Sequence, residues 1–173
     1  MLLASLIVLL AAAAPQPFDD ASARAVVLIF TRTDCPISNR YAPEVKRIYD
    51  AYASKGARFF LVYPDRDETS DAIEKHRSEF GYPMPALQDP SHQWVARGQA
   101  KVTPEAAVFV HPAGKEWTLV YHGRIDDRYI DFGKSRRQAN VHDLQNALEA
   151  ALAGQKVTPA ETKAIGCFIA DLR

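Results

Sequence analysis

The sequence predicts an α/β domain with a mixed four-stranded sheet and helices on both faces. Two apolar runs, 25–31 and 57–63, flank a stretch of helical periodicity, and this β-α-β order requires parallel strands with a right-handed crossover. Two later runs, 106–110 and 117–122, are joined by a short turn containing proline and glycine, which predicts an antiparallel hairpin. The predicted order of elements is β-α-β-α-β-β-α.

The first helix is predicted over residues 39–54. Its apolar side chains fall at helical spacing and give it one buried face: Val45, Ile48, Tyr49 and Tyr52. Gly56 ends this helix. The second helix begins at Thr69 or Ser70, because either hydroxyl can cap the first turn, and it runs to Phe80.

The remaining segments are assigned from proline content and periodicity. Residues 82–90 are rich in proline and are therefore predicted to be extended. A short helix is expected over 91–98, a polar loop over 123–140 and a last helix over 141–153. Residues 155–173 are expected to form an irregular C-terminal tail.

Length and charge limit the possible functions. The chain has 173 residues, which suits one domain, predicted here over residues 25–154. Lys plus Arg and Asp plus Glu each total 21, so no basic surface points to a nucleic-acid partner. The five histidines lack the spacing of a zinc site, and no motif implies an organic cofactor. The predicted site therefore contains no metal and no cofactor.

Residues 1–14 are apolar apart from Ser5 and end in four alanines. Such a run is too short to span a membrane, and small residues at the end of an apolar run are typical of a signal-peptide cleavage site. An uncleaved anchor or a misassigned start codon are the alternatives. We expect cleavage after Ala14, a linker over 15–24, and a mature protein that is periplasmic or secreted and has no stable membrane span.

Cys35 lies between the first predicted strand and the first helix. A cysteine at the first turn of a helix meets unpaired backbone N–H groups and the positive end of the helix dipole. Both favour the thiolate, which is the nucleophilic and metal-binding form of cysteine. Cys35 is therefore expected to be an exposed, reactive residue, with an inert core cysteine as the alternative.

The element order, with a cysteine after the first strand, resembles the thioredoxin-like superfamily. Cys35-Pro36-Ile37-Ser38 stands where that superfamily has Cys-x-x-Cys, and Pro43 matches the proline within its active-site helix. Thr103-Pro104, just before the third predicted strand, matches the loop whose cis-proline faces the catalytic sulfur. The resemblance implies that Thr103, Pro104 and Pro36 bind substrate, because the backbone before such a proline can bind an extended peptide.

A longer set of segments resembles a subgroup of exported redoxins, labelled alkyl hydroperoxide reductase-like or thiol-specific antioxidant-like. The segments are 33–43, Val-Thr-Pro-Glu at 102–105, Gly-Arg-Ile-Asp-Asp at 123–127, and Gly166-Cys167. The chain departs from the peroxiredoxin pattern, because Arg32 occupies its threonine position and Leu28 its proline position. Peroxidase activity is therefore an alternative and not the main expectation.

Ser38 replaces the second cysteine of Cys-x-x-Cys, so no disulfide can form within the motif. Its hydroxyl would either hydrogen-bond the Cys35 thiolate or serve only as a first-turn residue, and the two roles are compatible. Cys167 would either resolve an oxidised Cys35, form a permanent bridge with it, or never meet it.

These observations predict a thiol-disulfide oxidoreductase in which Cys35 is the nucleophile, with Cys167 as the candidate resolving residue and Ser38 as a supporting one. Its partners would be a protein or small-molecule thiol, disulfide or peroxide, and a thiol electron donor. The alternatives are a thiol peroxidase, or a redox-silent binding module or metallochaperone in which Cys35, Cys167 and His122 hold Cu(I).

Overall fold

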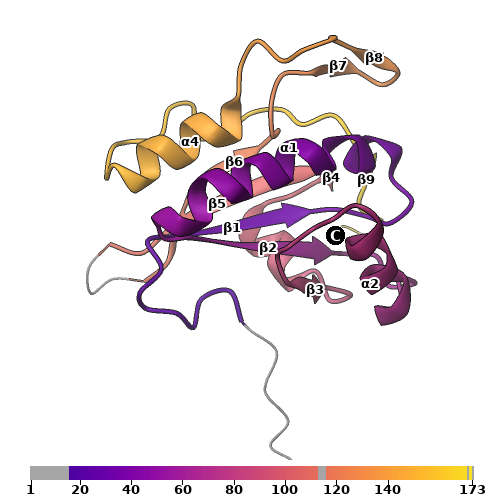
Figure 1. The fold of residues 1–173 in the computed structure, drawn as a ribbon, viewed down its shortest axis with the longest axis horizontal. Helices are drawn as coiled ribbons and strands as arrows, with labels where there is room; N and C mark the ends of the chain where they lie inside the picture. Colours follow the sequence, from indigo (N-terminus) through magenta and orange to yellow (C-terminus); the bar gives the residue numbers. More distant parts are fainter. Residues whose placement is uncertain (1–15, 113–115, 171, 173) are drawn as a thin grey trace, which may run out of the picture.

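The computed structural model describes residues 16–112, 116–170 and 172, and the predicted signal peptide and the start of the linker lie outside this part. A mixed sheet in the order β3-β2-β1-β5-β6 forms its centre (Figure 1). The strands are β1 (Ala25–Phe30), β2 (Ala57–Tyr63), β3 (Ala86–Gln88), β5 (Glu105–Val110) and β6 (Thr118–Gly123). The helices are α1 (Pro36–Tyr52), α2 (Ser70–Glu79), α3 (Gln93–Gly98) and α4 (Asp143–Leu152).

Strand pairing confirms the predicted mixed sheet and adds one strand to it. β1 and β2 are parallel, while β1–β5 and β5–β6 are antiparallel. The prediction of four strands was wrong, because the end of the proline-rich segment 82–90 forms β3 and pairs in parallel with β2. This pairing is not local, and proline spacing by itself predicts only an extended chain.

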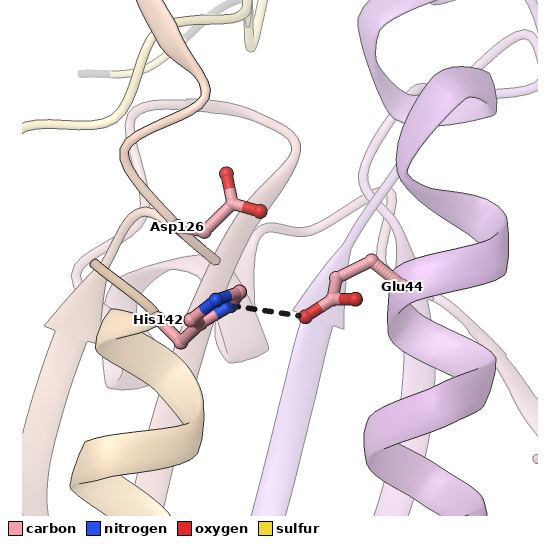
Figure 2. Close-up of side chains that lie close together, drawn as sticks. All are labelled: Glu44, Asp126 and His142. Atoms are coloured by element: carbon pink, nitrogen blue, oxygen red, sulfur yellow. Dashed lines mark ion pairs between the residues drawn. The ribbon is translucent and has the colours of Figure 1, made fainter. Parts of the chain in front are cut away.

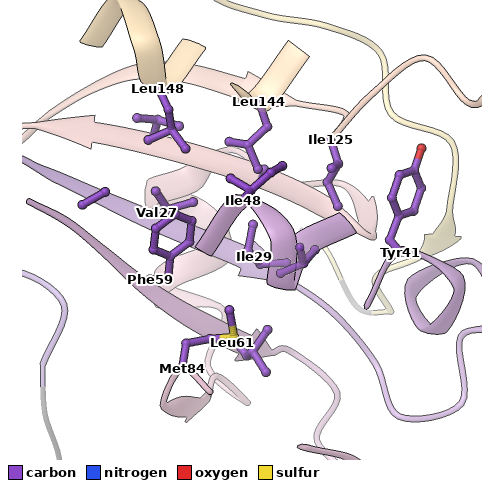
Figure 3. Close-up of a cluster of buried hydrophobic side chains, with 14 of the residues drawn as sticks. Val27, Ile29, Tyr41, Ile48, Phe59, Leu61, Met84, Ile125, Leu144 and Leu148 are labelled. Atoms are coloured by element: carbon purple, nitrogen blue, oxygen red, sulfur yellow. The ribbon is translucent and has the colours of Figure 1, made fainter. Parts of the chain in front are cut away.

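The strand residues alternate between two apolar cores. On one face, Val27 and Ile29 pack with α1 and α4, as Figure 3 shows for Ile48, Leu144 and Leu148. On the other face, a second cluster includes residues of β1 together with α3: Val26, Leu28, Phe30 and Val95. Helices therefore cover both faces of the sheet, as predicted.

Helix ends differ from the predicted bounds by a few residues. α1 starts at Pro36, because proline suits the first turn of a helix, and it continues into a short 3-10 turn, Ala53–Lys55. Thr69 caps α2 as expected, since its hydroxyl oxygen accepts a hydrogen bond from the backbone N–H of Ala72 at 3.2 Å.

Two segments predicted to be irregular carry short strands. The loop 123–140 contains the pair β7 (Tyr129–Asp131) and β8 (Lys134–Ser135). The tail contains β9 (Cys167–Phe168), which pairs antiparallel with β4 (Val102–Thr103) beside the amino end of α1 (Figure 1). Strands of two or three residues leave no readable alternation in a sequence.

The described part of the segment 15–24 packs on the domain. The ring of Phe18 lies between Trp94, Phe109 and Trp117, at centroid distances of 5.7, 5.1 and 5.5 Å. The backbone N–H of Arg24 donates to the carbonyl of Gly56 at 2.8 Å. Among residues 16–112, 116–170 and 172, no helix is long and apolar enough to cross a membrane.

Candidate active site at Cys35

Cys35 is the residue that precedes α1, in the position of its N-cap. The short loop after β1 delivers it there, as predicted, and its Sγ donates a hydrogen bond to the backbone carbonyl of Thr103 at 3.2 Å. The expectation of an exposed sulfur was wrong, because Cys35 is only 1% exposed. The sequence placed the residue at a helix end but could not show what lies over it.

Two side chains bond the loop that carries Cys35, and two more hold one of them. A carboxylate oxygen of Glu68 accepts a hydrogen bond from the backbone N–H of Thr33 at 2.6 Å, and Asn39 Nδ2 donates to the carbonyl of Thr33 at 3.1 Å. Asn39 Oδ1 then accepts from Nε2 of His76 at 2.9 Å, so the other ring nitrogen, Nδ1, accepts from the Tyr63 hydroxyl at 2.8 Å. The loop is thus held through both backbone polar groups of Thr33.

Opposite Cys35, the peptide bond between Thr103 and Pro104 is cis. Glu105 follows it and is buried rather than solvated: one carboxylate oxygen accepts from the backbone N–H groups of Lys101 at 2.8 Å and Val102 at 3.2 Å. Burial raises the pKa of Glu105, although these two hydrogen bonds act in the other direction. Glu105 therefore folds the chain back on itself just before Thr103.

The C-terminal tail brings Cys167 to the same place. Cys167 lies directly opposite Thr103 in the β4–β9 pair, and Gly166 precedes it. A Cβ atom added to Gly166 would overlap the Thr103 carbonyl and lie 2.6 Å from its carbon atom, so only glycine allows this approach. Both cysteines are free thiols.

The two thiols have opposite pKa shifts. Burial raises the pKa of Cys35, but hydrogen bonds from Cys167 and Ser38 outweigh burial and lower it overall. Burial, the hydrogen bond to Cys35 and the charge of Cys35 together raise the pKa of Cys167. The pair therefore holds one proton on Cys167 while Cys35 ionises first.

Ser38 is buried in the first turn of α1 at 1% exposure. Within the described residues its hydroxyl has no hydrogen-bond partner of standard geometry while Cys35 is a thiol. A thiolate at Cys35 would give that hydroxyl an acceptor, which agrees with its contribution to the lowered pKa of Cys35. Pro36, the remaining predicted site residue, is exposed at the first position of α1.

Arg32, which stands at the threonine position of the peroxiredoxin pattern, forms two ion pairs. Its guanidinium pairs with Asp34 at 3.2 Å and with Asp65 at 2.8 Å. Both carboxylates lie on the loops that follow β1 and β2, so Arg32 ties the two strand ends together.

The predicted copper candidate His122 lies in β6 beside two carboxylates. Its ring nitrogens are 3.8 Å from Glu105 and 3.9 Å from Glu161. In the part of the chain that the structure describes, the one group of three possible ligands within 4.8 Å of one another is Glu44, Asp126 and His142, with neither sulfur in it (Figure 2).

Protein donors already satisfy most of that group. Arg47 donates to both carboxylate oxygens of Glu44, at 2.7 and 2.9 Å, and one oxygen of Asp126 accepts from the Tyr41 hydroxyl at 2.5 Å. His142 Nδ1 lies 3.6 Å from Glu44. The group therefore joins α1 to the start of α4.

An apolar groove of about 550 Å³ lies on the outer side of the β4–β9 pair. Val102 and Phe168, which alternate with Thr103 and Cys167, line it, and Phe132 of the β7–β8 turn lies across from them. The side chains of Cys35 and Cys167 are not part of its lining. The small sheet therefore separates this groove from the sulfurs.

The sequence did not indicate Glu68 and Asn39 as supports of the Cys35 loop. Nor did it indicate Thr162, whose hydroxyl oxygen accepts a hydrogen bond from the backbone N–H of Arg124 at 3.1 Å and so anchors the tail. None of them has a local signal, because each acts across more than 30 residues or on a backbone group. Gly166 did carry a signal: a glycine beside a cysteine, consistent with close backbone approach.

Part of the chain matches a known protein family. A model of the AhpC/TSA family matches residues 11–115. The chain is similar to the crystal structure of a hypothetical protein from Sinorhizobium meliloti, with 24% identity, a TM-score of 0.71, and coverage of 86% of this chain and 80% of that one.

Two further structures extend the comparison. An uncharacterized conserved protein from Geobacillus kaustophilus has 26% identity and a TM-score of 0.69, with 84% of this chain and 76% of that chain covered. A thioredoxin-like protein in its oxidized form, with 16% identity and a TM-score of 0.54 over 77% of this chain and 80% of that one, shares the fold. No curated protein matches the chain.

Proposed function

The chain belongs to the AhpC/TSA family, and we propose that it is a thiol-disulfide oxidoreductase with Cys35 as nucleophile and Cys167 as resolving cysteine. The observation that carries this proposal is the meeting of the two cysteines at Thr103, with a lowered pKa at Cys35 and a raised one at Cys167. A pair of thiols with unequal pKa values separates the attacking sulfur from the resolving one.

In the first step, the Cys35 thiolate attacks one sulfur of a substrate disulfide. The substrate S–S bond breaks, a mixed disulfide with Cys35 forms, and the other half of the substrate leaves as a thiolate. The Ser38 hydroxyl and the Cys167 thiol stabilise the attacking thiolate by hydrogen bonding.

The first step also activates Cys167. Once Cys35 is bonded to substrate, its negative charge no longer raises the pKa of Cys167, and the proton of Cys167 can pass to the departing thiolate. The Cys167 thiolate then attacks Cys35 Sγ, which forms the Cys35–Cys167 disulfide and releases the second half of the substrate. Two electrons move from the protein to the substrate, and an external thiol donor returns them.

Mass spectrometry of the reduced protein after mixing with hydroxyethyl disulfide tests the proposal. We expect the wild-type protein to lose two hydrogens as the Cys35–Cys167 disulfide forms. Cys167→Ser should stop at a mixed disulfide on Cys35, and Cys35→Ser should form neither product. A wild-type protein that keeps both thiols free throughout would rule the redox pair out.

The same variants distinguish the two alternative functions. A thiol peroxidase would form the disulfide with hydrogen peroxide far faster than with hydroxyethyl disulfide. A copper chaperone would bind Cu(I) through both thiolates, lose binding in Cys35→Ser, and show no turnover with either oxidant.

Export is a separate part of the proposal. The short apolar run over residues 1–14, ending in four alanines, supports a signal peptide and a periplasmic or secreted mature protein. Expression in a bacterial host, followed by N-terminal sequencing of the periplasmic fraction, should give a chain that begins near Pro15. An uncleaved chain retained in the cytoplasm would contradict export.

A further inference from the structure

The C-terminal tail occupies the backbone edge beside Cys35. The edge of β4 next to the sulfur would be open to an extended peptide, because an unpaired strand edge accepts another strand. In this protein Val102 and Thr103 pair with Phe168 and Cys167 of the same chain. Any peptide substrate that used this edge would first have to displace the tail.

Several anchors hold the tail in place. At its near end, the backbone of His122 exchanges hydrogen bonds with Ala160 and Thr162, at 3.0 and 3.1 Å. Thr162 Oγ1 also accepts from the backbone N–H of Arg124 at 3.1 Å and lies 2.7 Å from the Tyr121 hydroxyl.

At its far end, Ile169 is 5% exposed within the second apolar core, and its N–H donates to the carbonyl of Lys101 at 3.2 Å. Gly166 contributes the close contact with Thr103 between these two ends. Burial of an aliphatic side chain and a set of backbone hydrogen bonds describe a fixed part of the fold. Segments that open readily lack such contacts.

We propose that this tail is a fixed cover that selects the substrate of Cys35. It admits small disulfides and excludes disulfides carried on folded proteins, and Gly166 is the residue that allows the tail to pack against Thr103. The inference rests on the proposed function, since it names the substrate class of the same thiol. Two observations support it: Cys35 is 1% exposed, and the neighbouring backbone edge is already paired.

Alkylation tests the cover without relying on turnover. In a Cys167→Ser background Cys35 is the sole remaining cysteine, and its rate is measured with N-ethylmaleimide and with a maleimide on a long polyethylene glycol. Gly166→Ala cannot keep the contact with the Thr103 backbone, so the tail must move away. We expect the rate with the bulky reagent, divided by the rate with the small one, to rise about tenfold. This corresponds to a decrease of about 1.4 kcal/mol in the free energy needed to displace the tail.

A matched control and a second variant isolate the effect. Gly81→Ala adds the same methyl group where no atom lies within 4 Å, at a left-handed φ of +66° that an alanine adopts only with strain. It therefore controls for a general loss of stability outside the tail, and it should leave the ratio unchanged. Ile169→Ala removes the buried anchor without touching Thr103, and it should raise the ratio in the same direction. Circular dichroism shows which of Gly166→Ala and Ile169→Ala remain folded. If the ratio of alkylation rates is unchanged in a folded variant, the proposal that the tail covers Cys35 is wrong.

Turnover separates the cover from the proposed function. With both cysteines present, the wild-type protein should reduce hydroxyethyl disulfide much faster than it reduces insulin. In Gly166→Ala the rate with insulin should come closer to the rate with hydroxyethyl disulfide. Equal wild-type rates would overturn the selectivity. If no variant reduces either disulfide but the alkylation ratio shifts as expected, the oxidoreductase proposal fails while the cover over Cys35 stands.

Discussion

At the scale of single residues, the proposed reaction depends on which of the two thiols, Cys35 or Cys167, loses its proton first. Cys35 is buried and Cys167 is half-buried, and hydrogen bonds lower the pKa of Cys35 alone. Burial alone would raise the pKa of both thiols. In the reaction proposed above, the polar neighbours Ser38 and Cys167 therefore make Cys35 the nucleophile.

Replacement of Ser38 by alanine should move the pKa of Cys35 upward, because the thiolate loses one hydrogen-bond donor while its burial is unchanged. A hydrogen bond to a charged group contributes about 1.5–3 kcal/mol. The pH profile of iodoacetamide alkylation, measured in the Cys167→Ser background, should shift to higher pH. Ser22→Ala, a change at an exposed serine, should not shift it. Superimposable profiles for Ser38→Ala and its parent would show that the hydroxyl plays no part.

At the scale of elements, three short segments assemble the site: the loop after β1, the turn that carries β4, and β9 of the tail. Each is held by side chains that bond backbone groups, such as Glu68 at Thr33 and Glu105 at Lys101. Side chains of this kind replace the ladder hydrogen bonds that such short segments lack. The half-buried carboxylate of Glu68 and the buried one of Glu105 therefore position the backbone near the sulfurs.

Glu105 should make the stability of the β4 turn depend on pH. Burial raises its pKa in the folded protein, so its favourable contribution is complete below the ordinary carboxyl pKa and is lost as pH rises through the raised value. Glu105→Gln keeps an oxygen acceptor and removes the charge. The free energy of unfolding of Glu105→Gln, measured in urea, should therefore increase relative to that of the wild type as pH rises from the ordinary carboxyl pKa through the raised one.

The control for Glu105→Gln is Glu161→Gln, which neutralises an exposed carboxylate on the other side of His122. Its difference from the wild type should stay nearly constant with pH. If the difference in free energy of unfolding between Glu105→Gln and the wild type is equally independent of pH, burial does not destabilise the charged form of Glu105 in the folded protein.

At the scale of the whole molecule, the core on the α1 and α4 face fixes the position of the site. α4 contributes Leu144 and Leu148, both fully buried, and packs beside α1 over the sheet (Figure 3). The ion pair of Arg124 with Asp143, at 2.7 Å, joins the loop after β6 to the first turn of α4. The same loop receives Thr162 of the tail, so core packing and the position of Cys167 are linked.

Truncation of Leu144 to alanine should destabilise the protein by about 2–5 kcal/mol, because it leaves a cavity in a core where the side chain is 0% exposed. Urea unfolding followed by circular dichroism measures this loss. Val141→Ala removes a side chain that is 41% exposed just before α4, and it should change stability by less than about 0.5 kcal/mol. Similar losses for the two variants would contradict the assigned core.

The amino-acid sequence by itself determined the order of the main elements and the position of Cys35 at the start of a helix. Apolar periodicity and turn residues are local signals, and they locate β1, α1, β2 and α2 within a few residues. It also indicated the loop at Thr103 and Pro104, through its place before a strand that pairs with β1.

Only the tertiary structure decided the rest: the fifth strand β3, the burial of Cys35, and the pairing of Cys167 with Thr103. These features depend on contacts between segments far apart in the chain. Strands of two residues, such as β4 and β9, are also too short to show a periodic pattern in the sequence. A sulfur's exposure and its pKa depend on what packs over it and on which donors face it. Ser38 is near Cys35 in the sequence, but the other neighbours of Cys35, Thr103 and Cys167 of the tail, come from distant segments.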